Sequence, residues 1–228
     1  MPLPTPIWVT EDSFTDSNGT LLLAHLTDTG GTWIRVVGWG IDDDGECVIQ
    51  SNTVRRPTFA EDPGAAGGET LFYASDSMPA EIAGLVVEAH VARLNTSNGA
   101  AFALYQNADG STGNSDILCW IGANGQPVYG FEGGSYSGTS VITGEHLLRY
   151  ETDFTTVNCY LDGGLLFTEG WEHPPYRSGP LVGRVGFDLF DFSGGASVGV
   201  RDLKIGYISA TESEFWTDFI KTTEILPA

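Results

Sequence analysis

The sequence predicts an all-β protein, a two-sheet antiparallel jelly-roll sandwich that ends in a short C-terminal helix or arm. Three observations predict this fold class. Apolar residues recur at every second position in most periodic segments, Gly, Asn and Asp form turns between those segments at short intervals, and helical spacing is confined to residues 212–221. We therefore predict an extended N-terminal arm at residues 1–11, the sandwich at 12–208, and a C-terminal helix or arm at 209–228.

A meander of three antiparallel strands, residues 145 to 167, is the clearest unit of the pattern. Turns are expected at residues 153–155 and 162–164, because Asp and Gly favour tight hairpins. Since side chains alternate between the two faces of a strand, the apolar residues of the first two strands should share one buried face. These residues are Leu148, Tyr150, Val157, Cys159 and Leu161.

The longest predicted strand is 84–94, which should place Val87, Ala89 and Val91 on one face and Glu88 and His90 on the other. Further strands are predicted at 33–37, 46–51, 69–74, 100–106, 116–122, 126–131, 183–190 and 197–208. Residues 133–139 are interpreted as a mobile segment.

Three prolines among the first six residues favour an N-terminal arm with few ladder hydrogen bonds. Trp8 in this arm should pack on its own sandwich or on a neighbouring subunit, and the sequence leaves both open.

Composition excludes several classes of partner. The chain of 228 residues carries 30 acidic against 10 basic side chains, a formal net charge of −20. Nucleic acid and anionic membrane surfaces are excluded, because both are bound through clusters of basic residues. The charge favours solubility, or else a divalent cation or a basic partner surface. We find no signal-peptide pattern and no membrane-spanning stretch, so we expect a soluble protein made in a cytoplasm.

Cysteines and carboxylates offer few candidates for chemistry. Cys47, Cys119 and Cys159 form no CxxC pair, which predicts buried free thiols. Asp42, Asp43 and Asp44 crowd one turn and form either a Ca²⁺ loop or an acidic hairpin tip, without the ligand spacing of an EF-hand. No cofactor is required by any motif, and Ca²⁺ is the one candidate.

Two groups of residues resemble a known superfamily. The first is the N-terminal pattern D-x-F-x-D-x-N-G-T-x-L, followed by His25 and by D-x-G-G-x-W ending at Trp33. The second is a v-x-x-Y-x-D-G hairpin and a closing strand VGVRDLKIG, which supply Val157, Tyr160, Asp162, Gly163 and Asp202. Together they are similar to the concanavalin A-like lectin/glucanase (laminin-G-like) jelly rolls, of the kind found in phage virion proteins.

That superfamily includes glycosidases, lectins and non-catalytic adhesion or virion modules, so the resemblance does not settle the function. Its glucanases use an E-x-D-x-x-E strand, which is absent here. Glu88 and His90 share a strand face and are either an acid/base pair or a polar pair on a solvated face. We therefore expect a protein that is not an enzyme, with a glycoside hydrolase as the weakest alternative.

The leading hypothesis that the resemblance implies is a phage virion protein, such as a capsid decoration, head-fibre or tail-associated module. It would be made in the host cytoplasm and located in the virion. Its partners would be other virion proteins and further copies of itself. The chain ends supply the expected interface residues, which are Trp8, Phe215, Trp216, Phe219 and Ile220.

The alternative is a carbohydrate-binding lectin module, adhering to a cell-surface glycan. Aromatic and polar residues in loops could stack on and hydrogen-bond sugar rings. The candidates are Tyr136, Trp171, His173, Tyr176 and Arg177.

Overall fold

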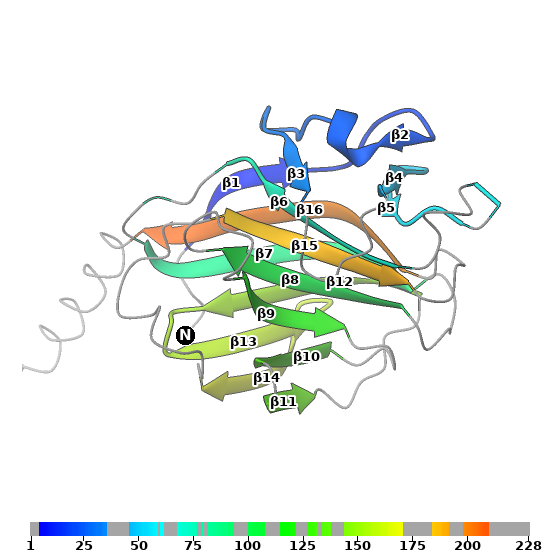
Figure 1. The fold of residues 1–228 in the computed structure, drawn as a ribbon. Helices are drawn as coiled ribbons and strands as arrows, with labels where there is room; N and C mark the ends of the chain where they lie inside the picture. The colour runs from blue at the N-terminus through cyan, green and yellow to red at the C-terminus, as the bar shows by residue number, and fades with distance from the viewer. Residues whose placement is uncertain are drawn as a thin grey trace, which may run out of the picture.

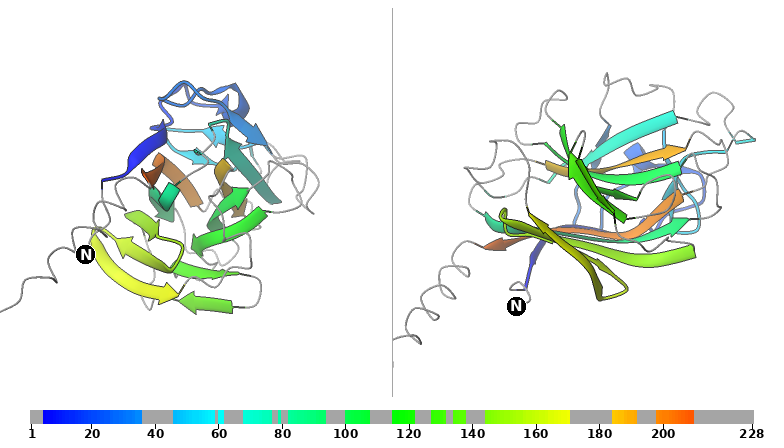
Figure 2. Two further views of the ribbon diagram at one scale, coloured as in Figure 1. Left: turned by 90° about the vertical axis from the view of Figure 1, so that its left-hand side faces the viewer. Right: turned by 90° about the horizontal axis from the view of Figure 1, so that it is seen from below.

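A computed structural model provides the structure of the protein. It describes residues 5–35, 46–58, 60–61, 68–76, 79, 82–93, 100–107, 115–121, 127–131, 134–137, 144–170, 184–191 and 198–209. Within these ranges, two antiparallel sheets lie face to face, which confirms the predicted β-sandwich (Figure 1). The views from the side and from below in Figure 2 show the two layers separately.

The nine-stranded sheet has the order β14-β13-β12-β7-β16-β5-β4-β2, with β1 also paired to β16. Its strands are β1 (Ile7–Asp12), β2 (Thr20–Leu21), β4 (Val48–Ile49), β5 (Val54–Arg55), β7 (Ile82–Arg93), β12 (Gly144–Thr152), β13 (Thr156–Leu161), β14 (Gly164–Gly170) and β16 (Val198–Ser209).

The seven-stranded sheet has the order β11-β10-β9-β8-β15-β6-β3. Its strands are β3 (Trp33–Arg35), β6 (Gly68–Ala74), β8 (Ala100–Asn107), β9 (Ser115–Ile121), β10 (Pro127–Phe131), β11 (Gly134–Ser137) and β15 (Arg184–Asp191). A single 3-10 turn, η1 (Leu22–Ala24), interrupts the strands of the described residues.

The predicted meander is confirmed as β12, β13 and β14. Tyr150 lies opposite Cys159 and Leu148 opposite Leu161 in the register of β12 and β13. The turn into β14 has Asp162 and Gly163 at φ values of 49° and 80°, both positive as a two-residue hairpin turn of type I′ requires. Asp-Gly therefore sets the register of this hairpin.

The N-terminal segment differs from its prediction. Ile7–Asp12 forms β1 and pairs antiparallel with β16, from Ile7 opposite Tyr207 to Asp12 opposite Leu203. The expectation of few ladder hydrogen bonds is wrong for these six residues, because all three prolines precede β1 and leave its backbone N–H groups free to pair. Residues 133–139 also differ, because Gly134–Ser137 within them is strand β11, paired with β10.

Aromatic residues from separate segments fill the core between the sheets. The Phe187 ring on β15 lies 5.0 Å from the Trp33 ring on β3 and 5.9 Å from the Phe72 ring on β6, measured between centroids. Phe14, just after β1, stacks on Trp33 at 6.0 Å. The predicted apolar face of β7, including Val87 and Val91, packs into the same cluster. This core fixes the nine-stranded sheet so that its other face points outward.

Cys47 and Cys159 are buried and outside any disulfide, as predicted, whereas the side chain of Cys119 is not among those that the structure describes. Burial raises the pKa of the Cys159 thiol to about 12, against a small lowering by its hydrogen bond with Tyr150. The thiolate is the reactive form. In a variant that keeps Cys159 alone, we expect no labelling by a thiol reagent at pH 8 in the native state and full labelling in urea. Rapid native labelling would contradict the buried position.

Candidate functional site

A row of five polar side chains crosses the outer face of the nine-stranded sheet. The register places Glu11 on β1 opposite Lys204 on β16, and Lys204 opposite Glu88 on β7. Glu88 lies opposite Arg149 on β12, which lies opposite Tyr160 on β13. Each is therefore a direct cross-strand neighbour of the next, and the charges alternate in sign.

Ion pairs hold this row in place. Lys204 Nζ lies 2.8 Å from Glu11 Oε2, and Arg149 Nη1 lies 3.2 Å from Glu88 Oε2. Arg149 also donates from Nε and Nη2 to Glu151 Oε1, at 2.7 and 2.6 Å. Hydrogen bonding to Glu11 is the main cause that raises the pKa of Lys204. Burial lowers the pKa of Arg149, but Glu151 and Glu88 together raise it by more. Both cations are therefore fixed in their charged forms.

Trp8 covers one end of the row. Its ring lies against β16, where a Cβ added at Gly206 would come within 2.7 Å of the ring, so only glycine fits beneath it. Lys204 Nζ lies 5.7 Å from the Trp8 ring centroid, at the distance of a cation–π contact. Trp8 therefore packs on the sheet of its own chain, which is one of the two partners that the sequence left open.

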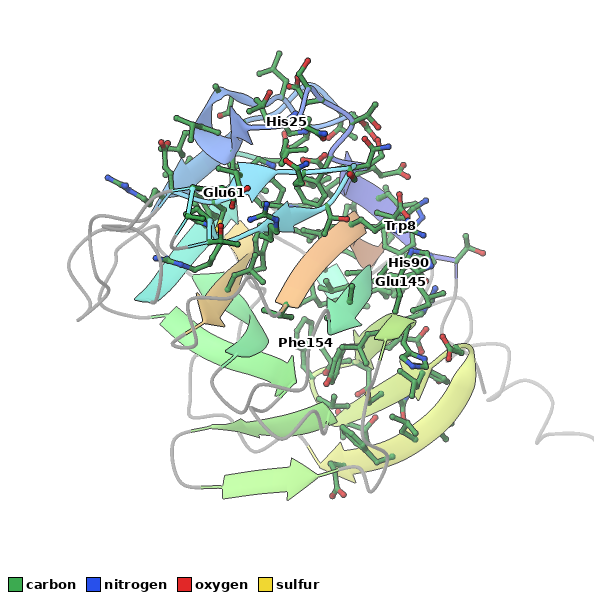
Figure 3. All side chains as sticks on the ribbon, turned by 90° about the vertical axis from the view of Figure 1, so that its right-hand side faces the viewer. Trp8, His25, Glu61, His90, Glu145 and Phe154 are labelled. Atoms are coloured by element: carbon green, nitrogen blue, oxygen red, sulfur yellow. The ribbon has the colours of Figure 1, made fainter. Side chains whose placement is uncertain are left out.

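A second group of charges lies beside the row, around His90 on β7. Asp202 Oδ2 lies 3.1 Å from His90 Nδ1 and 3.6 Å from Arg201 Nε. Arg201 Nη2 also pairs with Glu145 Oε1 at 2.5 Å. Asp202 has a φ of 49°, at the point where the register of β16 against β7 shifts. This strained backbone turns the Asp202 carboxylate toward His90. Figure 3 shows Trp8, His90 and Glu145 along the same flank of the molecule.

We call these residues the polar face. Its members are Trp8, Glu11, Glu88, His90, Glu145, Arg149, Glu151, Tyr160, Arg201, Asp202 and Lys204. Glu88 and His90 share this face, as the alternation predicts, but Glu88 pairs with Arg149 and His90 with Asp202. Glu88 and His90 therefore each contact a different partner on this face.

Three buried side-chain atoms of the polar face make no hydrogen bond within the described residues: Glu151 Oε2, His90 Nδ1 and Arg201 Nε. The His90 and Arg201 atoms face Asp202 as ion-pair contacts rather than as aligned hydrogen bonds. Burial and the Glu151 carboxylate, which hydrogen-bonds the Tyr160 side chain, raise the pKa of Tyr160. Buried polar atoms are almost always hydrogen-bonded, so atoms with incomplete hydrogen bonding leave capacity on this face for a further partner. One atom is an acceptor, one is a donor, and the imidazole nitrogen can be either.

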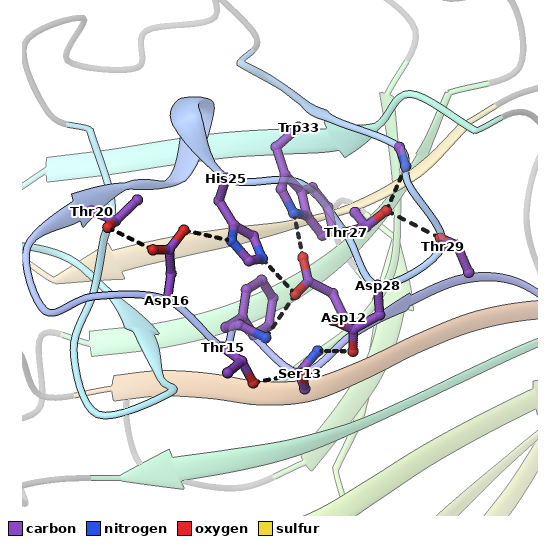
Figure 4. Close-up of polar contacts among 12 residues, drawn as sticks. Asp12, Ser13, Thr15, Asp16, Thr20, His25, Thr27, Asp28, Thr29 and Trp33 are labelled. Carbon is purple, nitrogen blue, oxygen red and sulfur yellow. Dashed lines mark hydrogen bonds and ion pairs between the residues drawn. The ribbon is translucent and has the colours of Figure 1, made fainter.

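The N-terminal pattern forms a second polar cluster, which is structural (Figure 4). The buried Asp12 carboxylate contacts His25 Nε2 at 2.8 Å and accepts from Trp33 Nε1 at 2.7 Å and the backbone N–H of Phe14 at 2.7 Å. His25 Nδ1 contacts the exposed Asp16 at 3.3 Å. Burial raises the pKa of the Asp12 carboxyl by more than these hydrogen bonds lower it. The cluster ties the end of β1 to β3 through Asp12 and Trp33.

A third polar contact, between Arg55 and Glu61, predicts that the stability of the fold depends on pH. Arg55 donates to both Glu61 oxygens, at 2.8 and 2.7 Å, and this pairing is the main cause that lowers the pKa of Glu61 to about 2. Because its folded-state pKa is depressed, Glu61 stabilises the fold above its ordinary pKa, and this contribution disappears as the pH falls toward 2. The Glu61 side chain is 44% exposed, so solvent screening limits the contribution to about 1 kcal/mol.

Urea denaturation of the wild type and of Glu61→Gln measures this contribution. We expect the variant to be less stable by about 1 kcal/mol at pH 7 and the difference to close between pH 4 and pH 2. A difference that stays constant with pH would show that the carboxylate charge is not its cause.

Most side chains that the sequence singled out as ligand, metal or interface candidates lie outside the described residues. These are Asp42, Asp43, Asp44, Trp171, His173, Tyr176, Arg177, Phe215, Trp216, Phe219 and Ile220. The backbone of Tyr136 lies in β11, opposite Tyr129. Within the described ranges, no group of three His, Cys, Asp or Glu side chains could hold a metal ion. Those ranges also hold no helix long and apolar enough to span a membrane.

Comparison with known proteins identifies a fold rather than a family. No family model matches the sequence, and no curated protein matches it either. Among solved structures, a beta-1,3-glucanase from Mycobacterium marinum is 15% identical, with a TM-score of 0.57 over 87% of this chain and 98% of that one. A structure from work on endo-acting O-glycanases of the human gut microbiota is 12% identical, with a TM-score of 0.56 over 89% and 100%.

A galectin-like protein of unknown function from Bacillus subtilis is 11% identical, with a TM-score of 0.52 over 77% of this chain and 89% of that one. At such identities the likeness concerns the fold alone. The chain thus shares the β-sandwich fold of these solved structures, in agreement with the fold class that the sequence predicts.

Proposed function

We propose that the chain is a non-catalytic carbohydrate-binding module and that the polar face is its glycan-binding surface. The observation that carries this proposal is the mixture of unsatisfied atoms at Glu151, His90 and Arg201. A sugar hydroxyl both donates and accepts hydrogen bonds, so one kind of ligand group can satisfy all three atoms. An anion could satisfy only the donors, and a cation only the acceptors.

The dimensions and rigidity of the polar face also support a glycan chain. The row spans five strands, or roughly 19 Å at the usual strand spacing. Ion pairs hold most of its side chains in one arrangement, so little conformational entropy is lost when a ligand binds. Trp8 and Tyr160 add aromatic side chains at the two ends. The unsatisfied atoms are themselves buried, but two of the side chains that carry them are partly exposed: His90 by 33% and Arg201 by 41%.

The arrangement favours binding over hydrolysis. Glu88 and Glu151 both pair with Arg149, so neither is a free acid that could protonate a leaving group. The glucanase motif E-x-D-x-x-E is also absent from the sequence. Release of reducing ends from any glycan that the protein binds would overturn the non-catalytic part of the proposal.

A glycan array followed by calorimetry tests the binding. With the glycan that binds best, we expect Trp8→Ala and His90→Ala each to weaken affinity about tenfold or more, which corresponds to 1.4 kcal/mol. Asp28→Asn, an exposed change away from the polar face, is the control and should bind as the wild type does. If both variants bind normally while Trp171→Ala and Tyr176→Ala do not, the glycan site belongs to the 169–181 segment instead.

We further propose that the module acts as a component of a phage virion, in contact with other virion proteins and with further copies of itself. Leu21, Leu23 and Leu26 support a contact surface, because these three exposed leucines fall within six residues at edge strand β2 and just after it. Exposed apolar groups of this kind mark interaction sites. We expect an oligomer by native mass that dissociates in a triple Leu→Ser variant or after removal of residues 210–228. A monomer throughout would contradict self-association.

A further inference from the structure

We propose that the polar face selects uncharged glycans and rejects anionic ones, such as chains of uronic acids or sulfated sugars. This inference rests on the proposed glycan-binding function and names the class of ligand. Two observations support it: the cations of the polar face already have carboxylate partners, and carboxylates outnumber cations on this face.

Every cation on the polar face already has a carboxylate partner. Lys204 is paired with Glu11 at 2.8 Å, and Arg201 with Glu145 at 2.5 Å. Arg149 has two partners, Glu88 and Glu151. An anionic sugar must therefore break an existing ion pair before it can form its own. Pairing with the ligand would then give no net gain in Coulomb energy, and it would leave a protein carboxylate unpaired beside the ligand.

The excess of carboxylates on the polar face also opposes the binding of an anionic sugar. The three cations face five carboxylates, since Asp202 adds to the four partners named above. Protonation of His90 would not balance this excess. The chain as a whole carries a formal net charge of −20, which repels anions at distances up to the Debye length, about 10 Å at 0.1 M salt. Uncharged hydroxyls experience neither penalty and can still satisfy the atoms at Glu151, His90 and Arg201.

Matched pairs of oligosaccharides test this selectivity. Hexamers of glucose, mannose and galactose are compared by calorimetry with hexamers of the corresponding uronic acids, so that each pair differs in the carboxylate alone. We expect at least one neutral hexamer to bind and its uronate to bind at least tenfold more weakly. Equal binding within every pair would overturn the selectivity and leave glycan binding intact. Binding to no hexamer of either kind would count against the polar face as a glycan site and the selectivity with it.

A gain-of-binding variant separates local pairing from overall charge. Glu145→Gln removes the nearer of the two carboxylates that contact Arg201 and leaves Asp202, at 3.6 Å, as the remaining one. We expect its affinity for the uronate hexamer to rise about tenfold, with its affinity for the neutral hexamer unchanged. Glu169→Gln on β14 is the matched control, because it removes the same charge without releasing a cation of the polar face. An equal rise in both variants would show that net charge, and not pairing, sets the selectivity.

High salt provides an independent check. At 1 M salt the Debye length falls to about 3 Å, which removes long-range repulsion and leaves short ion pairs screened much less. We expect the wild type still to prefer the neutral hexamer under these conditions. Loss of the preference at 1 M salt would overturn the argument from paired cations.

Discussion

Replacing Asp12 by alanine should lower the free energy of unfolding by about 3 to 5 kcal/mol, the usual cost of removing one partner from a buried polar network. Asp12 is fully buried, and its carboxylate is the shared partner of His25, Trp33 Nε1 and the backbone N–H of Phe14. The alanine variant leaves these groups unsatisfied inside the protein, and each costs about 1 to 3 kcal/mol. Urea denaturation at pH 7, followed by Trp fluorescence, measures the loss.

Two companion variants make the Asp12 result specific. Asp12→Asn keeps one acceptor and turns the other into a donor, so it should recover only part of the loss. Asp28→Ala removes an exposed carboxylate that accepts from the backbone N–H of Ser13 at 2.9 Å, and should cost about 1 kcal/mol or less. If Asp12→Ala costs no more than Asp28→Ala, the cluster does not anchor β1.

Replacing Arg149 by leucine should destabilise the protein by about 2 to 3 kcal/mol, since a partly buried pair costs somewhat less to break than a fully buried one. Arg149 is the only cation within ion-pair distance of Glu88 and Glu151 among the described residues. Glu151 is 5% exposed, so without Arg149 its charge would be buried and unpaired. The free energy of unfolding from urea titration is again the measurement.

A double-mutant cycle shows whether the unpaired charge causes this loss. Adding Glu151→Leu to Arg149→Leu removes the stranded carboxylate, so the double variant should be more stable than Arg149→Leu alone. Additive losses would mean that the two side chains contribute independently. The same variants report on the glycan site, because both lie on the polar face and should weaken glycan affinity while the sandwich stays folded.

The alternation of apolar residues predicted most long strands, because one face of each strand is buried and the period of two is then visible in the sequence. The strand over 84–94 and the meander after Glu145 are of this kind. Strands of two residues, such as β2 and β5, are too short to show alternation and depend on their neighbours in the sheet. The sequence pattern does not predict the short β1, because three prolines directly before it favour an unpaired extended arm.

The polar face could not be assembled from the sequence, although its members are visible there. Alternation places Glu88 and His90 on one side of a strand, but the neighbours of Glu88 come from distant parts of the chain. Arg149 and Lys204 reach it only through the register of β7 against β12 and β16. Pairing register depends on packing and turn geometry across the whole sheet, so it cannot be obtained from one segment alone.

The double pairing of β16 has a consequence for the order of folding. Along one edge β16 pairs with β7, and along the other it pairs first with β5 and then with β1. Ile7 and Tyr207 are neighbours in this sheet although roughly 200 residues separate them, and such distant pairings slow folding. During synthesis, β1 has no partner until residue 209 has left the ribosome. Until then its backbone hydrogen-bonding groups can pair with other chains. High-level expression should therefore favour aggregation of incompletely synthesised chains.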